Sequence, residues 1–348
     1  MNTTMKDIAK IAGVSINTVS RALNDKPEIN EKTRRRIKRI ARELNYTPNS
    51  IAASLASRKT KTIGLIIPDI CDPFFAQQAR GVEDTAKEEG YSVILLNTDE
   101  ISEAELKAVA TLRSIRVAGL MLTSVFPGTD HIENLNKQKV PLVLLNRRCQ
   151  EIDTNYVIND NQKGAYKATK HLIKLGHKKI GVILGPQRIT SVLDRYVGYK
   201  KAMAEAGIEL SEKYIVYGEN LKPSTGEILA EQLLRNNPRP TAILAYCDSL
   251  AIGAYAAARN MGLSIPEELA LVGYDDIPYA QYFEIPLTTV AQPAYNMGKA
   301  ACKIILEKIK LGGDEKDLES QHIVFEPELV IRKSCGAQVQ IESSWSDY

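Results

Sequence analysis

The sequence lacks the patterns by which several protein classes are first recognised. It has five cysteines, an odd and scattered set without a C-x-x-C pair, which argues against a disulfide framework and a zinc site. Apolar runs such as Thr62–Pro68 are far shorter than the ~20 residues that cross a bilayer. The amino-terminal MNTTMKDIAK has no apolar stretch after its charges, unlike a secretory signal. We therefore expect a cytoplasmic protein without a membrane segment. The cysteines are Cys71, Cys149, Cys247, Cys302 and Cys335.

Motifs of common enzymes are absent as well. No two glycines stand two residues apart, so G-x-G-x-x-G is missing, and so are the Walker phosphate loop and G-x-S-x-G. The four histidines form no H-E-x-x-H motif, and His177, which follows Gly176 at an expected helix end, is interpreted as structural. These absences predict a protein that is not an enzyme and that uses no cofactor and no metal.

The charge that is present is unevenly distributed. The 348 residues are 44% hydrophobic and 25% charged, which is ordinary for a folded protein, and the length suggests two or three domains. Residues 1–60 hold 13 Lys and Arg against 5 acidic residues, a net charge of +8, so the remainder carries −5 of the total of +3. A basic head on an acidic body indicates a polyanion-binding module. The alternative is a basic surface that merely faces solvent.

Helical spacing predicts three short helices in the head, over Met5–Ala12, Ile16–Leu23 and Glu31–Leu44. The linker between the first two contains Gly13, which can end a helix, and Ser15, which can cap the next. Two helices joined by about three residues with a glycine form a helix-turn-helix, although any helical hairpin would share the pattern. The apolar residues at helical spacing are Met5, Ile8, Ile11, Ala12, Ile16, Val19, Ala22, Leu23, Ile37, Ile40, Ala41 and Leu44.

The first ~60 residues resemble one family closely. The stretches MKDIAKIAGVSINTVSRALND and INEKTRRRIKRIARELNYTPNSIAASLASR are similar to the DNA-binding head of the lactose-repressor/galactose-repressor family. The resemblance implies that the chain is a transcriptional regulator, a repressor of carbohydrate-metabolism genes, that binds double-stranded operator DNA. The alternative is an architectural protein that also binds DNA but does not regulate transcription.

In this docking geometry the second helix lies in the major groove. Arg21 can bind guanine, Asn17 can pair with adenine, and Ile16 can contact a thymine methyl. Short polar groups suit phosphate oxygens, and these are Ser15, Thr18, Ser20 and Asn24. Alternatives remain for three of the positions: Ile16 could be core, and Thr18 and Ser20 could face solvent. Val19 is expected in the core.

A candidate hinge helix follows the head at Thr47–Ser57, with Pro48 at the first helical position. About ten residues are too few for a stable isolated helix, so we expect this segment to fold on DNA. By the resemblance, two such helices pair in the minor groove, where Leu55 wedges between base pairs and Ala52 lies on the same face. The alternative is that Leu55 packs against the body.

The body alternates strands and helices in two similar rounds, which predicts parallel sheets with helices on both faces. The fold class expected is an all-α helix-turn-helix head plus an α/β body of two doubly wound subdomains. Stretches such as IGLIIPDICDPFF, GHKKIGVILGP and LALVGYDDIP extend the resemblance to the same family through the body, and the body also resembles the periplasmic sugar-binding proteins. Expected strands are 62–68, 91–97, 117–123, 141–145, 179–184, 214–217, 241–246, 269–274, 322–325 and 329–332. Expected helices are 74–89, 102–114, 130–137, 162–175, 192–206, 224–236, 248–261 and 295–311.

Domain boundaries follow from this pattern. The head is 1–47, the hinge and linker 48–60, the effector-binding and dimerisation domain 61–336, and the tail 337–348. The closing segments are expected to cross back, one into each subdomain, so that the first comprises 61–160 and 291–322 and the second 161–290 and 323–336.

Ligands of open α/β sheets bind at the carboxyl ends of the strands. The loops expected there carry aromatic and polar side chains that suit a sugar, and they match the family's effector contacts. Taken alone, Phe74 and Phe75 could be core residues and Asp275 could cap a loop. The predicted effector-binding residues are Asp72, Phe74, Phe75, Asn146, Arg147, Ser191, Arg195, Cys247, Asp248, Asp275 and Gln292.

Two positions depart from the sugar-binding pattern. Cys247 stands where such relatives usually carry Asn, and Ile189 occupies a loop position that is often polar. The effector expected is a sugar or a sugar derivative; a purine or another metabolite, or a protein corepressor, remain open. Tyr295 and the helix after it resemble the segment by which catabolite control protein A receives a phosphorylated carrier protein, but Lys303 and Ala294 differ from it.

Palindromic operators call for a homodimer. Tyr279, Tyr282 and Phe283 are candidate interface aromatics, with ordinary core burial as the alternative. No heptad run follows residue 335, so a coiled-coil tetramer is not expected. An effector that changes the lobe geometry next to the hinge would shift operator occupancy, by induction or by corepression.

Overall fold

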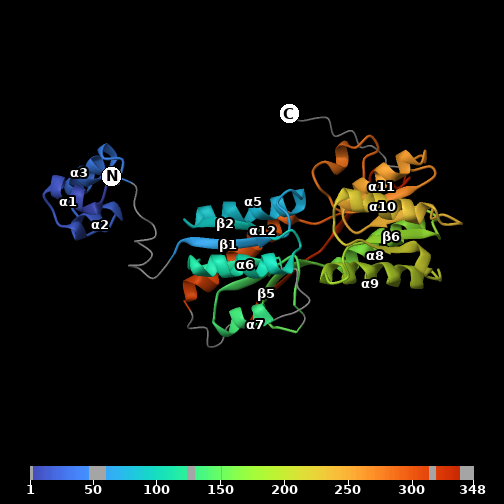
Figure 1. Ribbon diagram of the computed structural model, residues 1–348, viewed down its shortest axis with the longest axis horizontal. Coiled ribbons are helices and arrows are strands. Elements are labelled where there is room, and N and C mark those ends of the chain that lie inside the picture. The colour runs from blue at the N-terminus through green and yellow to red at the C-terminus, as the bar shows by residue number, and fades with distance from the viewer. Residues whose placement is uncertain (1–2, 47–59, 124–129, 150, 313–318, 338–348) are drawn as a thin grey trace. The chain divides into compact units, whose positions relative to one another are not determined.

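The computed structural model describes residues 3–46, 60–123, 130–149, 151–312 and 319–337 (Figure 1). The chain forms two compact units, the head, Met1–Thr60, and the body, Lys61–Tyr348. The hinge segment, with Ala52 and Leu55, and the residues of the tail after position 337 lie outside the described residues. In the described part, no helix is long and apolar enough to cross a membrane.

The head is a three-helix cluster of α1 (Met5–Ala12), α2 (Ile16–Leu23) and α3 (Glu31–Glu43). Gly13 ends α1 with a φ of 61° in the left-handed region, and Ser15 caps α2 by accepting a hydrogen bond from the Thr18 N–H. Of the apolar residues predicted at helical spacing in the head, Ile11 departs most from a core position, because it is 54% exposed. The head core consists of Ile8, Ala9, Ala12, Val19, Ala22, Ile37, Ile40 and Ala41.

The first subdomain is built on a parallel sheet in the order β11-β5-β4-β3-β1-β2. Helices α5 and α12 share one apolar cluster with the sheet, and α6 and α7 share another, so the sheet is covered on both faces. Its elements are β1 (Thr62–Ile67), α5 (Pro73–Glu88), β2 (Ser92–Asn97), α6 (Ser102–Ser114), β3 (Gly119–Leu122), α7 (Asp130–Lys137), β4 (Leu142–Leu145), β5 (Asn155–Asn159), α12 (Ala294–Leu311) and β11 (His322–Phe325).

The second subdomain has the sheet order β12-β10-β9-β8-β6-β7, parallel except for β12, which runs antiparallel to β10. Helices α8 and α9 pack against each other, as do α10 and α11. Its elements are α8 (Asn161–Lys174), β6 (Ile180–Leu184), α9 (Thr190–Glu205), η1 (Glu212–Tyr214), β7 (Ile215–Tyr217), α10 (Pro223–Leu234), β8 (Ala242–Ala245), α11 (Asp248–Asn260), β9 (Ala270–Asp275), η2 (Ala280–Tyr282), β10 (Thr288–Ala291) and β12 (Glu328–Val330).

The predicted fold class is confirmed, and the expected elements that fall within the described residues lie within two residues of their predicted ends. Two strands were not predicted, β5 and β10, and these lie where the chain passes between the subdomains. The last crossing also falls later than expected, because β11 pairs with β5 of the first sheet through Phe325. The predicted boundary after residue 322 is therefore about three residues too early.

Candidate DNA-binding and effector sites

The exposed face of α2 carries the three predicted base-reading side chains. Asn17 and Arg21 are exposed, and they lie on the side of the helix opposite Val19, which is fully buried as predicted. Ile16 is 42% exposed, so the alternative that it belongs to the core is wrong. Ile16, Asn17 and Arg21 thus offer an apolar group, an amide and a guanidinium to a DNA groove, while the buried side of the helix packs in the head core.

The predicted phosphate-contacting residues lie on α2 or at its caps. The Ser15 hydroxyl accepts from the Thr18 N–H at 3.1 Å and lies 2.9 Å from the Thr18 hydroxyl. At the other end, the Asn24 side-chain amide donates to the Ser20 carbonyl at 2.8 Å. Ser20 and Thr18 are half-buried rather than fully solvated. These contacts fix both ends of α2; phosphate binding by the four residues stays a prediction.

In the body, the predicted effector residues follow the carboxyl ends of strands, as the sheet topology requires. Asp72 follows β1, Arg147 follows β4, and Arg195 lies on α9 after β6. Asp275 ends β9, and Gln292 follows β10. The residues thus come from both subdomains, and those of the second converge on one buried cation.

That cation is Arg195, which is 4% exposed. Its guanidinium carbon lies 3.5 Å from the centre of the Tyr274 ring and 4.2 Å from that of the Tyr246 ring. Its Nε donates to Asn161 Oδ1 at 2.8 Å, and its Nη1 donates to the Tyr246 carbonyl oxygen. The charge is therefore held between two aromatic faces, which is a favourable arrangement for a desolvated guanidinium.

Asp275 provides the negative partner of this arrangement. Its Oδ1 lies 3.6 Å from Arg195 Nη1 and accepts from Gln292 Nε2 at 2.6 Å. The backbone of Asp275 has a φ of 117°, in the left-handed region, a conformation that is rare outside glycine and that accumulates at functional sites. Burial raises the pKa of its carboxyl well above the usual range, and Arg195 opposes that rise. We call Asn161, Arg195, Tyr246, Tyr274, Asp275 and Gln292 the Arg195 cluster.

Two of the predicted effector residues have a buried oxygen without a hydrogen-bond partner among the described residues. One such oxygen is Oε1 of Gln292 and the other is Oδ1 of Asn146, whose backbone has a φ of 67°. A buried acceptor without a partner costs free energy, and such groups commonly receive a water or a ligand donor. Both therefore fit a site that takes up hydroxyl groups.

Asp248, also predicted to bind the effector, makes its hydrogen bonds within the second subdomain. Its Oδ1 accepts from the Thr289 hydroxyl at 2.6 Å, and its Oδ2 accepts from the Ile277 N–H at 2.9 Å. Burial raises the pKa of this carboxyl to about 7. Both oxygens are thus engaged inside the second subdomain, where they fix the loop after β9, and a ligand contact by Asp248 stays a prediction.

Other predicted effector residues are also packed into the protein. Phe74 and Phe75 are 4% and 5% exposed and belong to the apolar core that includes α12, in agreement with the alternative that they are core residues. Ser191 and Cys247 are buried too, and the Ser191 hydroxyl lies 2.8 Å from that of Tyr246. Burial raises the pKa of the Cys247 thiol well above its ordinary value. The thiol is therefore neutral and a weak donor.

Among the described residues, hydrogen bonds between side chains or loops of the two subdomains lie near this site, and three of them join residues that are distant in sequence. The Ser249 hydroxyl donates to Asp72 Oδ2 at 3.2 Å. Arg188 donates to the Glu100 carbonyl at 3.3 Å. The Asn159 amide donates to the Tyr274 hydroxyl at 3.4 Å. The lobes are thus joined by a small number of polar contacts that a ligand could replace or reinforce.

Sequence reasoning missed several residues that build the site. Glu100 forms a two-point ion pair with Arg147, with N–O distances of 3.0 and 2.5 Å. Tyr246 directly follows β8, and Tyr274 is the second-last residue of β9. Their places at the carboxyl edges of strands were the available signal, but ring stacking on a distant arginine has no sequence signature.

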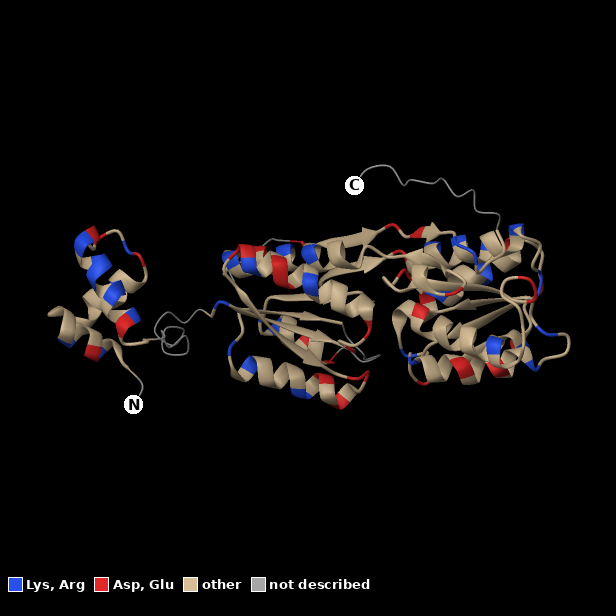
Figure 2. Ribbon diagram, turned by 90° about the horizontal axis from the view of Figure 1, so that it is seen from above, with Lys and Arg blue, Asp and Glu red and all other residues tan. Residues whose placement is uncertain are grey.

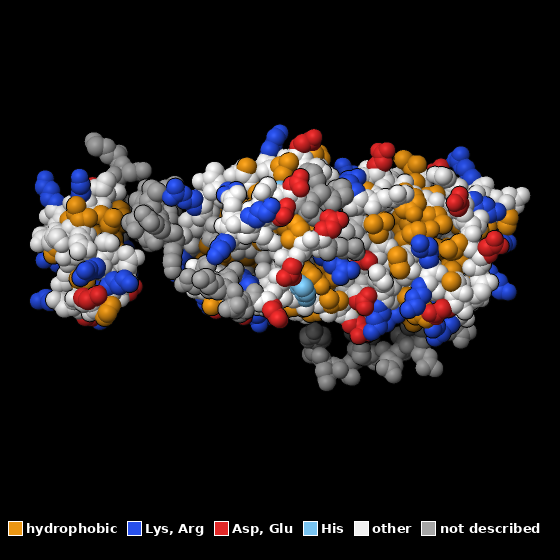
Figure 3. All heavy atoms as spheres, turned by 90° about the horizontal axis from the view of Figure 1, so that it is seen from below, with side chains coloured by type: hydrophobic (Ala, Val, Ile, Leu, Met, Phe, Trp, Pro, Cys, Tyr) orange, Lys and Arg blue, Asp and Glu red, His pale blue; other side chains and the backbone are white. Residues whose placement is uncertain are grey.

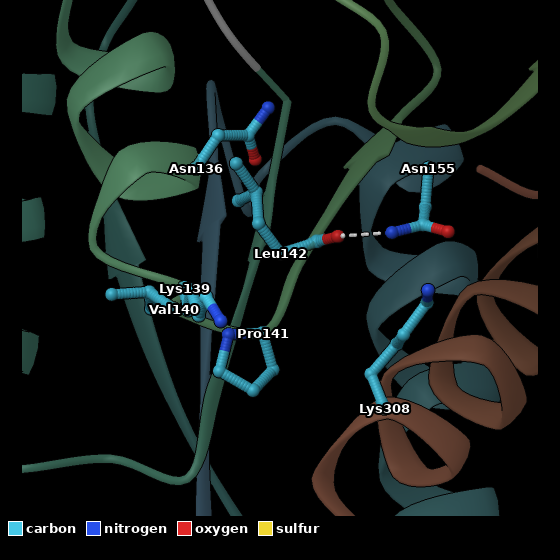
Figure 4. A pocket seen from close by; sticks show the side chains of 7 residues that line it. All are labelled: Asn136, Lys139, Val140, Pro141, Leu142, Asn155 and Lys308. Atoms are coloured by element: carbon cyan, nitrogen blue, oxygen red, sulfur yellow. Dashed lines mark hydrogen bonds between the residues drawn. The ribbon is translucent and has the colours of Figure 1, made fainter. Parts of the chain in front are cut away.

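A small hollow lies at the amino-terminal ends of strands in the first sheet (Figure 4). It is found where β4 and β5 begin, whereas the predicted effector residues follow strand ends. The Asn155 amide in its wall donates to the Leu142 carbonyl at 3.1 Å. The hollow is therefore separate from the predicted effector site. Its lining residues are Asn136, Lys139, Val140, Pro141, Leu142, Asn155 and Lys308.

Comparison with known proteins agrees with both halves of this architecture. Residues 4–49 match the family described as bacterial regulatory proteins, lacI family. Residues 60–327 match the family described as periplasmic binding proteins and sugar binding domain of LacI family. The chain is 36% identical to the HTH-type transcriptional repressor PurR of Actinobacillus pleuropneumoniae, over 95% of this chain and 98% of that one. It is 37% identical to the ribose operon repressor of Haemophilus influenzae, with the same coverage.

A solved structure of the lac repressor dimer bound to operator and the anti-inducer ONPF is also similar. It has a TM-score of 0.86 and 28% identity, covering 97% of this chain and 100% of that chain. The chain belongs to the LacI family. It is a DNA-binding transcriptional regulator of the repressor type with a ligand-binding body, and it is not an enzyme, as predicted.

Proposed function

We propose that the protein is a homodimeric repressor of carbohydrate-metabolism genes whose effector is a sugar or a sugar derivative bound between the subdomains. DNA binding is a property of the family to which it belongs. The effector class rests mainly on the Arg195 cluster. It is supported by the likeness to the ribose operon repressor of Haemophilus influenzae.

The chemistry of the Arg195 cluster favours a polyhydroxylated ligand. A sugar hydroxyl both donates and accepts hydrogen bonds, so it can donate to the Asp275 carboxylate and accept from the Arg195 guanidinium. Both groups are more than nine-tenths buried, and charge-assisted hydrogen bonds are strong in such surroundings. The buried Gln292 Oε1 offers a further acceptor.

Cys247 and Ile189 narrow the ligand class. Both are buried and neither can replace the amide or hydroxyl group of a sugar-binding relative. We infer a ligand that presents a less hydroxylated edge there, such as a deoxy or otherwise modified sugar. An acidic substituent would be accommodated by Arg188, which donates to the backbone carbonyl of Glu100, because the charge of Arg147 is already paired with the Glu100 carboxylate.

A ligand screen by thermal shift tests this proposal. Pentoses, hexoses, their phosphates and their acids are added to the purified full chain, and one of them is expected to raise Tm. Asp275→Ala should remove that rise, whereas Asp153→Ala, a matched change at a carboxylate whose side chain is 75% exposed, should leave it unchanged. Stabilisation that survives Asp275→Ala, or stabilisation by purines alone, would contradict the proposal.

Dimerisation is supported by two exposed aromatic side chains. Tyr279 and Tyr282 are 62% and 78% exposed on the turn that contains η2, so the alternative that they are core residues is wrong. Phe283 is half-buried and stacks edge-on against Tyr255, with ring centres 5.9 Å apart. Large exposed aromatics in one place are typical of interfaces. Tyr282→Ser should shift the sedimentation profile toward the monomer, and an unchanged profile would exclude this surface.

Switching would occur by population shift. Ligand binding changes the relative stability of the lobe arrangements, and the proposed hinge helices, with Ala52 and Leu55, respond by folding or unfolding on the minor groove. A swing in operator occupancy from 1:99 to 99:1 requires about 5.5 kcal/mol of differential binding. Two ligands per dimer can share that requirement. Leu55→Ala should weaken operator binding while leaving the body folded.

A second candidate effector is a phosphorylated carrier protein acting as corepressor. The first turns of α12 present Tyr295, whose hydroxyl donates to Asp84 at 3.2 Å, and the Lys299 ammonium 5.5 Å from its ring. Lys303 is exposed one turn further on. Lys299→Glu combined with Lys303→Glu should abolish binding of such a phosphoprotein. The sugar-induced rise in Tm should be retained in that variant.

A further inference from the structure

The outer side of α3 carries a continuous row of positive charge. Ile37, Ile40 and Ala41 of this helix are buried in the head core. The opposite side, at helical spacing, presents five cations, all exposed. We call this surface the α3 basic face, and it consists of Lys32, Arg35, Arg36, Arg39 and Arg42. Figure 2 shows both blue and red segments in the head, with several blue ones in succession along one helix, and Figure 3 shows blue side chains at several places on the surface of the head.

Few acidic side chains neutralise this face. Arg35 pairs with Glu31 at 2.9 Å and Arg39 with Glu43 at 3.5 Å. Both arginine side chains are more than 70% exposed, so water and salt weaken these pairs. Lys32, Arg36 and Arg42 make no ion pair with any residue that the structure describes.

The head's structural requirements do not account for these five cations. The basic residue that does stabilise the head is Arg34, which donates to the carbonyl oxygens of Lys26 and Ile29 at 2.9 and 3.0 Å. Arg34 thereby holds the loop between α2 and α3. Lys38 pairs with Asp25 in the same region. The α3 basic face lies elsewhere on the helix and leaves its charge to solvent or to a partner.

The α3 basic face also points away from the base-reading surface. The apolar side of α3 shares the head core with Val19 and Ala22 of α2, and α3 contacts both α1 and α2. The reading residues Asn17 and Arg21 lie on the opposite side of α2. The two outward-facing surfaces of this helix pair are therefore directed to opposite sides of the head. A duplex in contact with Asn17 and Arg21 leaves the α3 basic face open.

We propose that the α3 basic face binds the phosphate backbone of a second DNA duplex while the α2 surface occupies the operator. The row from Lys32 to Arg42 extends over about 15 Å of helix. Apart from the adjacent Arg35 and Arg36, its cations are three or four residues apart, a rise of about 4.5–6 Å, so several of them can contact phosphates of one duplex. The face offers cations without a carboxylate row or an apolar groove, which suits a backbone better than a folded protein surface.

A second contact of this type would be independent of sequence and sensitive to salt. Each phosphate neutralised contributes about −0.9 to the slope of log K against log salt concentration. Such a contact would let the bound repressor hold a neighbouring DNA segment and pass to it directly. It would act during the search for an operator and would add no base specificity.

The test is a capture assay with the full chain. Operator duplex on beads is saturated with protein, and retention of a labelled 30-base-pair duplex without an operator sequence is measured from about 50 to 200 mM salt. The triple variant Arg36→Gln, Arg39→Gln and Arg42→Gln should reduce capture by about tenfold or more at the lower salt. It should keep its operator affinity within about twofold, because these residues face away from the operator.

Two control variants make the result specific. The triple change of Arg36, Arg39 and Arg42 to Lys keeps the charge and should retain capture. The triple change Lys174→Gln, Lys178→Gln and Lys179→Gln removes the same charge from the exposed surface of the body and should also retain it. Equal losses of capture and operator affinity in the glutamine variant would overturn the proposal, as would undiminished capture. Displacement of the second duplex by polyglutamate at equal charge would assign the face to an acidic protein instead.

Discussion

The guanidinium carbon of Arg195 lies 3.5 Å from the centre of the Tyr274 ring, and this stacking places a buried cation beside the carboxyl of Asp275. The two residues come from α9 and β9, which lie almost 80 positions apart in the sequence. The tyrosine also contacts the other lobe, because its hydroxyl accepts from the Asn159 amide at 3.4 Å. One aromatic ring therefore links the charge of the proposed ligand site to the contact between the lobes.

Removal of the Arg195 cation should destabilise the body. Arg195→Met leaves Asp275 without its positive neighbour, and breaking a buried pair in this way costs about 3–5 kcal/mol. The raised pKa of Asp275 lets that carboxyl take up a proton instead, so we expect the lower end of the range. Chemical denaturation at pH 7 measures the change, with Lys201→Met on the exposed side of the same helix as the control.

A second prediction concerns pH. The pKa of Asp248 is raised from 3.8 to about 7 in the folded protein, so the native state binds this proton more tightly than the unfolded state. Its contribution to stability is present below pH 4 and is lost as pH rises through about 7. The free energy of unfolding should fall by up to about 1.4 kcal/mol per pH unit in that window for this one proton.

Asp248→Asn isolates this effect from other titrating groups. Asp72 and Asp275 also have raised pKa values and contribute with the same sign, whereas Glu326, lowered to about 2, contributes with the opposite one. Urea unfolding of wild type and variant between pH 4 and 8 gives the difference. If the free energy of unfolding depends on pH in the variant as it does in the wild type, Asp248 is not the source of that pH dependence.

The bond between Ser249 and Asp72 is predicted to restrain the lobes. Ser249→Ala removes a hydrogen bond to a carboxylate, which is worth roughly 1.5–3 kcal/mol. The free protein should therefore become more open, with a larger radius of gyration in small-angle scattering. Ser224→Ala, at an exposed position in α10, serves as the control. A scattering profile identical to that of the wild type would show that this bond does not restrain the lobes.

Base recognition by Arg21 gives a fourth prediction. A bidentate arginine–guanine pair discriminates by about 1–3 kcal/mol, so Arg21→Ala should lose that much operator affinity and accept other bases at one position. Selection of binding sites from a random duplex pool measures both effects. Arg35→Ala, on the other side of the head, should leave the selected sequence unchanged.

The sequence was sufficient to predict most of the fold, for reasons that individual segments illustrate. Strands such as Thr62–Ile67 are runs of buried aliphatic residues, and helices such as Glu31–Glu43 bury apolar residues at helical spacing. Strand β5 was missed because it begins and ends with asparagine, a residue that is depleted in strands. Strand β10 was missed because two threonines, Thr288 and Thr289, interrupt the aliphatic pattern of a buried strand. Both are stabilised by neighbours from distant parts of the chain.

The candidate site was harder to predict than the fold. Resemblance to the family located Arg195, Asp275 and Gln292, which the structure brings together. It also selected Phe74 and Asp248, whose contacts are internal. Residue type and position cannot distinguish a carboxylate that faces a ligand from one whose oxygens are both used by the backbone and a neighbouring hydroxyl.

The path of the chain gives the body a property that neither sheet has by itself. The polypeptide passes from one lobe to the other after β5, after β10 and after β11, so each lobe is assembled from separated stretches of sequence. A fragment that ends near residue 160 lacks both α12 and β11, and therefore an edge strand and half of one covering layer. Recombination between relatives would have to exchange at least two segments at once to transplant a lobe, so the two lobes are expected to be inherited as one unit.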